Sequence, residues 1–183
     1  MTEIAAIIGE FFSHYKEIPV DSIEIKEEVR QMCEQNTCGN YNKNWTCPPA
    51  VGPLEESSRK FRQYTKFILI YHVYKLQNSF DWRGMQEGGI DFGQRLVALK
   101  RRLEETEDVL VLGAGGCRLC PECTYASGNP CRNPKDAIIS CEAYGIDVMS
   151  LMKKNGLPYY NGPNSMTLIA GVLYGRRRDT ATA

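Results

Sequence analysis

The sequence predicts an α/β fold in which a small, mainly parallel sheet is flanked by helices, with cysteine-rich loops at strand ends, within one domain over residues 1–183. Residues 66–75 and 109–112 are apolar runs rich in β-branched or aromatic side chains, which indicates two buried strands. Apolar residues recur at helical spacing over residues 92–105, between these two runs. Strand, helix and strand in succession form a βαβ unit, which implies a parallel pair of strands.

The remaining elements follow from the same patterns along the chain. Ile4, Ile7, Ile8 and Phe11 recur at helical spacing, and Pro19 is expected to end that helix. The expected helices cover residues 2–17, 27–34, 55–64, 92–105, 134–145 and 148–154. The expected extended segments cover residues 21–25, 66–75, 109–112 and 167–174. Between them we expect loops at 36–52, which is rich in Asn, Gly and Pro, and at 79–89.

The composition is that of a globular protein with an ordinary core. Hydrophobic residues make up 43% and charged residues 24% of the chain, so a core can form without covalent cross-links. The 22 basic and 22 acidic residues cancel, which argues against a nucleic acid or an anionic membrane as partner. The short basic run at 176–178 is expected to be a solvated tail.

The location of the protein decides how its cysteines are interpreted. No segment approaches the ~18 apolar residues that span a bilayer, and the N-terminus lacks the basic start of a signal peptide. We therefore expect a cytoplasmic protein whose thiols stay reduced. Eight cysteines in such a chain indicate metal binding, and only two histidines argue against a histidine-based catalytic triad or a histidine-rich zinc site.

The segment 113–134 carries the most informative cysteine pattern. Cys117, Cys120 and Cys123 follow each other at intervals of three, and Cys131 comes after seven further residues. Three thiolates on one tight turn suit an iron–sulfur cluster, expected as [4Fe–4S], whereas structural zinc more often uses two separated Cys-x2-Cys pairs. Cys131 is the expected fourth ligand, although the ferredoxin run has only three residues before its last cysteine. Zinc and inert buried thiols are the alternatives.

The segment 33–52 carries a looser set, in which Cys33, Cys38 and Cys47 are candidate metal ligands. Either Cys141 supplies a fourth thiolate, or the site stays open. An open position on a metal allows an external molecule to bind, which is how metal sites become catalytic. Eight cysteines divide as four and four, so a second cluster is also compatible with the sequence.

Two stretches of the chain resemble a known family. The first runs from Cys38-Gly-Asn-Tyr41 to Trp45-Thr-Cys47-Pro48-Pro49, and the second includes Cys117-Arg-Leu-Cys120, Pro130-Cys-Arg-Asn-Pro134 and Glu142-Ala-Tyr-Gly-Ile-Asp-Val148. In these residues the sequence is similar to an uncharacterised family of bacterial and archaeal predicted metal-binding proteins. The resemblance implies metal binding, as iron–sulfur, in organisms with anaerobic metabolism, and it implies a residue other than cysteine at the position of Cys141 in relatives. It supplies no reaction.

Three functions follow from these patterns. The first is a cytoplasmic iron–sulfur protein with a redox or accessory role, which would require a redox partner protein. The second is a metalloenzyme whose open three-cysteine site binds a small substrate. The third is a zinc-stabilised interaction module.

Glu142 and Asp147 are expected either to relay protons or to cap a helix, with capping the commoner role.

Overall fold

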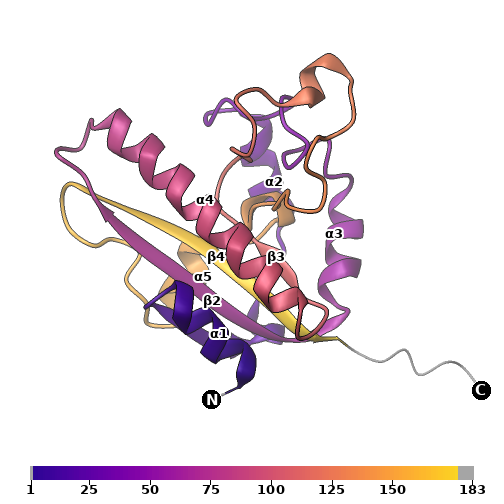
Figure 1. Cartoon of the computed structure of the whole chain (residues 1–183), viewed down its shortest axis with the longest axis vertical. Coiled ribbons are helices and arrows are strands. Elements are labelled where there is room, and N and C mark those ends of the chain that lie inside the picture. Colours follow the sequence, from indigo (N-terminus) through magenta and orange to yellow (C-terminus); the bar gives the residue numbers. More distant parts are fainter. Residues whose placement is uncertain (1, 177–183) are drawn as a thin grey trace, which may run out of the picture.

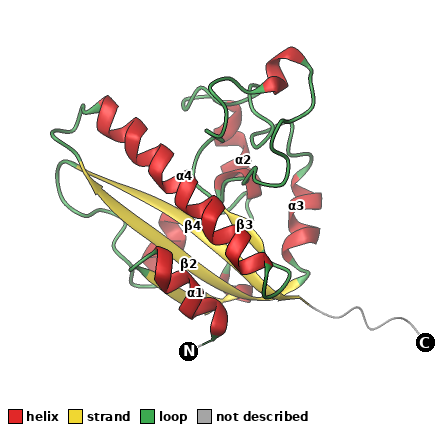
Figure 2. Cartoon of the chain, viewed as in Figure 1, coloured by secondary structure: helices red, strands yellow, loops and turns green. Residues whose placement is uncertain are grey.

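The protein is built around a four-stranded antiparallel sheet with helices on both faces, and the computed structural model describes residues 2–176 (Figures 1 and 2). The strands are β1 (Tyr15–Pro19), β2 (Tyr64–Lys75), β3 (Leu110–Leu112) and β4 (Ser165–Arg176). The helices are α1 (Glu3–Phe11), α2 (Glu27–Glu34), α3 (Leu54–Phe61), α4 (Trp82–Glu104) and α5 (Val148–Lys154). Short 3-10 turns occur at Val20–Ser22, Thr124–Ser127 and Glu142–Tyr144. Arg177 and Arg178 of the basic run lie outside the described residues.

The prediction of a mainly parallel sheet is wrong. The strand order is β1-β2-β4-β3, and every neighbouring pair is antiparallel. β2 and β3 do run in the same direction with α4 between them, as the strand–helix–strand pattern indicates, but they are not neighbours. β4 inserts between them and pairs with both, as in a split βαβ unit. The prediction failed because it assumed that consecutive strands pair, and the last strand of the chain took that place.

Alternating residues of β2 supply the two cores of the protein. Ile68 and Ile70 face one side, where they pack with α1 and α4, and Phe67 and Leu69 face the other. The second side is covered by α5, the end of α3 and the segment around Tyr144. Because side chains of a strand alternate between faces, a central strand buried on both sides reads as a continuous apolar run. Figure 1 shows α1 and α4 on the same face of the sheet.

Several element boundaries differ from the sequence predictions. The first helix ends at Phe11, and β1 begins at Tyr15, where the helix was expected to continue. β1 pairs with β2, and this pairing outweighs the helical periodicity of its residues. The segment 21–25 was expected to be extended, but its start belongs to a 3-10 turn. The expected helix at 134–145 is wrong, since only Glu142–Tyr144 forms a 3-10 turn there.

The long helix α4 begins ten residues before its expected start. The Asp81 side chain caps it by accepting a hydrogen bond from the Gly84 N–H at 2.9 Å. Its glycines argue for a loop by propensity, but one of them is required by packing. A Cβ on Gly88 would lie 2.9 Å from the Met166 side chain and 3.0 Å from the Tyr74 ring, both on the sheet. Close packing of α4 on the sheet thus overrides the low helix propensity of glycine.

Within residues 2–176, none of the helices combines the length and the apolar character that a membrane crossing requires.

Candidate metal centre

The two cysteine-rich loops lie side by side at one end of the molecule. In Figure 1 the segment that follows β3 (orange) lies next to the loop between α2 and α3 (purple). The Cys117 N–H donates to Thr46 Oγ1 at 3.1 Å, and Trp45 Nε1 donates to the Asn129 carbonyl at 3.2 Å. The Trp45 ring also meets the Tyr125 ring edge-on, with 4.9 Å between centroids. Of the two loops, only the one at 113–134 follows a strand; the other follows α2, contrary to the expectation that both begin at strand ends.

A glycine makes this close approach possible. A Cβ on Gly116 would lie 2.7 Å from Asn40 Oδ1, on the other loop. Real Cβ atoms do not approach another heavy atom so closely, so any larger residue here would displace the Asn40 side chain. The Gly-rich run after β3 therefore serves the contact between the two cysteine sets.

Cys117, Cys120, Cys123 and Cys131 line one small cavity of about 20 Å³. We call these residues the four-thiol set. Burial raises the pKa of Cys117, a hydrogen bond from the Leu119 N–H opposes this, and the nearby Cys131, Cys120 and Cys123 raise the pKa further. All three other members therefore lie within electrostatic reach of Cys117.

Groups around the four-thiol set provide hydrogen bonds to sulfur and to the loop backbone. Asn133 Nδ2 donates to Cys120 Sγ at 3.2 Å. Arg132 Nη1 donates to the Glu122 carbonyl at 3.0 Å, which ties the fourth cysteine to the turn that carries the other three. Thr124 Oγ1 donates to the Pro130 carbonyl at 2.9 Å, and this bond joins the two ends of the loop between Cys123 and Cys131. The seven-residue interval therefore folds back on itself, so that Cys131 reaches the same cavity as the others.

Cys33, Cys38 and Cys47 line a second, much larger cavity of about 440 Å³. We call these residues the three-thiol set. Cys33 lies in the last turn of α2, Cys38 is exposed on the following loop, and Cys47 is buried. Burial raises the pKa of Cys47 to about 11, and Cys38, Cys33 and Cys117 add to the shift. The hydrogen bond from the Cys117 N–H to Thr46, the residue before Cys47, shows that the two sets adjoin.

The cavity of the three-thiol set is also lined by residues far away in the sequence. Gly115 and Gly116 contribute to its wall, as do Ser140 and Glu142. Burial raises the pKa of Cys33, followed by the effects of Cys38 and Glu142, while Arg30 lowers it. Glu142 and Arg30 therefore act on Cys33 with opposite sign, and Arg30 itself donates a hydrogen bond to the carbonyl of Ala143, the residue after Glu142.

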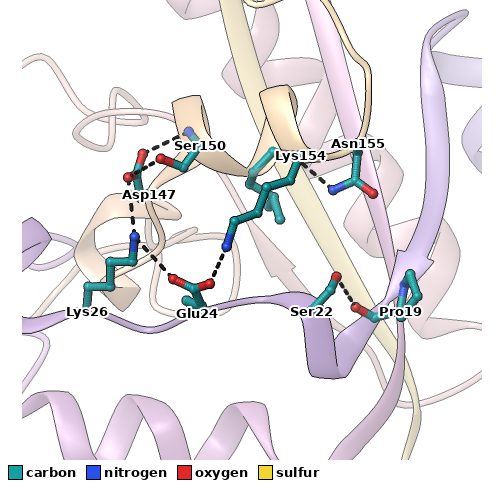
Figure 3. A network of polar contacts seen from close by, with 9 residues as sticks. Pro19, Ser22, Glu24, Lys26, Asp147, Ser150, Lys154 and Asn155 are labelled. Atoms are coloured by element: carbon teal, nitrogen blue, oxygen red, sulfur yellow. Dashed lines mark hydrogen bonds and ion pairs between the residues drawn. The ribbon is translucent and has the colours of Figure 1, made fainter.

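A polar network holds residues 142–147, which we call the Glu142 segment, against the residues that precede α2 (Figure 3). Lys26 Nζ lies 3.2 Å from Glu24 Oε2 and 3.7 Å from Asp147 Oδ2, and the Lys154 ammonium also forms an ion pair with Glu24. The Lys26 N–H donates to the Gly145 carbonyl at 2.8 Å. The exposed ion pairs contribute little stability each, but together with the backbone bond they fix the Glu142 segment relative to Cys33.

The thiols are close but are not preformed as an ion site. Within residues 2–176, no three or more His, Cys, Asp or Glu side chains lie close enough together to hold a metal ion as they stand. The raised pKa values of Cys33, Cys47 and Cys117 keep these three thiols neutral at pH 7, so each must lose a proton before its sulfur can bind a metal. The donor set nevertheless fits a thiophilic metal in kind, because thiolates select zinc and iron–sulfur clusters. Metal binding would displace protons and draw the loops together.

Comparison with known proteins gives one match. Residues 16–174 match the family described as "Predicted metal-binding protein (DUF2284)". The chain belongs to this family of predicted metal-binding proteins. The resemblance seen in the two cysteine motifs is thereby confirmed at the level of metal binding. No curated protein and no solved structure matches the chain.

In this family member, Cys141 is a core residue. It is 1% exposed and packs in the second core with Leu112 and Tyr144. Burial raises its pKa well above the ordinary value, and Glu142 adds to the shift. Cys141 lines neither cysteine cavity, so it is not placed to complete the three-thiol set.

The structure separates the roles of the two carboxylates considered from sequence. Asp147 caps α5, since its Oδ1 accepts a hydrogen bond from the Ser150 N–H at 3.0 Å. Glu142 caps no helix and lines the cavity of the three-thiol set instead. Sequence reasoning missed Arg30 and Asn133. Arg30 carries no local signal beyond its place one helical turn before Cys33, whereas Asn133 stands inside the second cysteine motif.

Both histidines lie away from the cysteines. His72 Nε2 lies 3.4 Å from Arg95 Nη1, and its ring packs edge-on against Tyr74. His14 stacks on Tyr71 with 4.9 Å between ring centroids. Neither residue lines a cysteine cavity.

Proposed function

We propose that this metal-binding protein carries a [4Fe–4S] cluster on Cys117, Cys120, Cys123 and Cys131 and has a redox or accessory role. The observation that carries the proposal is the return of Cys131 to the cavity lined by the other three thiols. A cluster needs several thiolates that converge from one side, and the Cys117–Cys123 turn with the folded-back Cys131 supplies them.

The hydrogen bond from Asn133 to Cys120 Sγ supports a cluster with a tuned potential. N–H donors stabilise the added negative charge of a reduced cluster, and they raise its reduction potential. A redox role further requires a partner protein that exchanges electrons with the cluster. Zinc bound to the same four thiolates, with a purely structural role, is the competing proposal.

Anaerobic purification with metal and sulfide analysis tests the cluster. We expect a brown protein with iron and acid-labile sulfide in equal amounts, and Cys120→Ser should lose most of both. Cys141→Ala is the matched control, because it removes a thiol that lines neither cavity. A colourless protein with stoichiometric zinc would reject the cluster in favour of the structural role.

A second candidate function is catalysis at the three-thiol set, and the large adjoining cavity favours it. A space of about 440 Å³ beside three thiols can admit a small molecule, as substrate sites of 300–1,000 Å³ do. A metal held by three thiolates would keep a position at which such a molecule binds. Electron paramagnetic resonance of the reduced protein tests this: addition of a small thiol or cyanide should shift a signal in wild type but not in Cys38→Ser. With iron bound at the three-thiol set, an unshifted spectrum would leave only the redox or accessory role.

A further inference from the structure

Glu142 and Cys141 are neighbours in the chain, but they serve different parts of the protein. Both lie at the 3-10 turn Glu142–Tyr144, where Cys141 packs into the second core and Glu142 lines the cavity of the three-thiol set. By residue type alone, Cys141 is the spare thiol that could supply the missing donor of this set. The turn presents the carboxyl of the next residue instead.

The Glu142 carboxyl has an unused donor atom. Its Oε2 is buried and has no hydrogen-bond partner within residues 2–176. A buried carboxyl oxygen without a partner is costly, and such an atom in a native structure requires an explanation. Burial also raises the pKa of Glu142, against the effect of hydrogen bonds from its own N–H and from Ser140. A cation bound in the cavity would satisfy this oxygen.

A buried positive charge lies on the other side of the same cavity wall. Arg30 is 6% exposed, and its guanidinium donates to the backbone carbonyls of Gly52 and Ala143. Within residues 2–176 it forms no salt bridge with a carboxylate. Three thiolates and one carboxylate around a divalent ion carry a net negative charge, and Arg30 is placed to offset part of it.

The loop that carries Cys38 is the exposed part of the site. Cys38 is exposed, and Gly39 has a φ of +75° with no atom within 4 Å of the position of a Cβ. The backbone turn here makes no close packing contact on that side. Cys33 and Glu142, by contrast, are fixed by α2 and by the network around Lys26 (Figure 3).

We propose that Glu142 is the fourth protein ligand of a metal centre formed with Cys33, Cys38 and Cys47, which binds a thiophilic divalent cation through three sulfurs and one oxygen. This inference rests on the proposed metal binding by the three-thiol set. It distinguishes the two centres chemically, because the four-thiol set offers sulfur alone. The cavity gives small molecules access to the metal, and a carboxylate is more easily displaced from zinc or iron by an incoming ligand than a thiolate is.

Cobalt(II) is the probe for this centre, since thiolate-to-cobalt charge-transfer bands report the bound sulfurs. The apo-protein is titrated anaerobically in competition with a chelator. Glu142→Gln should weaken the affinity of the three-thiol centre at least about tenfold, while the charge-transfer intensity at saturation stays the same. Glu34→Gln is the matched control: it removes an exposed carboxylate beside Cys33 that does not line the cavity, and its affinity should stay within about twofold of wild type.

Two further variants separate the possible failures. Cys38→Ser should abolish the charge-transfer bands of this centre; if it changes nothing, the three-thiol set binds no metal and the underlying proposal fails. Glu142→Cys should raise the saturating intensity of the centre by about one third, as four thiolates replace three. If Glu142→Cys leaves the intensity unchanged, or if Glu142→Gln binds cobalt as tightly as Glu34→Gln does, Glu142 is not a ligand.

Discussion

A methyl group at position 116 should weaken metal binding at the three-thiol set without unfolding the protein. The Cβ of Gly116→Ala would lie 2.7 Å from Asn40 Oδ1 and 2.8 Å from Asn40 Cγ. Asn40 would have to move, and its Nδ2 would then lose the 3.2 Å hydrogen bond to the Cys38 carbonyl. Gly116 does not have a positive φ, so the methyl acts through this contact alone.

The expected magnitude is that of one hydrogen bond. Without this bond the turn around Cys38 is no longer held in the conformation that binds metal. A net value of about 0.5–1.5 kcal/mol corresponds to a loss of roughly two- to twelvefold in affinity. The folding stability should fall by less than about 1 kcal/mol, since the clash meets the tip of a short side chain on a loop. Gly93→Ala on α4 is the matched control: nothing lies within 4 Å of its Cβ, and alanine there should stabilise the helix by about 0.5–1 kcal/mol.

The assay is the anaerobic cobalt titration, with denaturant unfolding of the same apo-proteins. Gly93→Ala should bind cobalt as wild type does. The reasoning is refuted if Gly116→Ala keeps full affinity at the three-thiol set, or if it loses affinity only in proportion to a general loss of folding stability.

Three further predictions concern the cluster, the core and the pH dependence of stability. Asn133→Ala removes the N–H donor to Cys120 Sγ and should lower the cluster's reduction potential by about 40 mV in a redox titration, if the bond is worth about 1 kcal/mol more in the reduced state; an unchanged potential contradicts this. Gly171→Ala would place a Cβ 2.3 Å from the buried Phe67 ring and should cost about 1–3 kcal/mol in urea unfolding, so an unaltered midpoint would count against the packing described. Asp147→Ala should cost about 1 kcal/mol at pH 7 by loss of the α5 cap. Hydrogen bonds from Ser150 lower the pKa of Asp147 in the folded state. The part of the stabilisation that depends on the Asp147 charge is therefore complete above the unfolded pKa of about 4. It is lost as the pH falls through the lower pKa of the folded state. The difference between wild type and Asp147→Ala should therefore shrink in acid, and a difference that grows below pH 4 would be incompatible with this sign.

Local patterns identified several elements correctly, because the signal of each was contained in neighbouring residues. α2 and α5 were predicted with the bounds that the structure has, and the strands at Lys66 and Thr167 were found within two residues of their starts. The capping role of Asp147 was also predictable, because a cap acts within one turn of its own helix. The start of α4 was missed because its glycines are explained only by the sheet against which the helix packs.

The sequence by itself determined that the protein has two cysteine motifs and belongs to a family of predicted metal-binding proteins. These properties depend on residue type and spacing, which the chain carries along its length. Only the tertiary structure decided that β4 separates β2 from β3, that the two cysteine loops adjoin, and that Glu142 rather than Cys141 faces the three-thiol set. Each of these depends on contacts between residues about 60 or more positions apart, and no local pattern specifies which distant segment will occupy a given edge of a sheet or wall of a cavity.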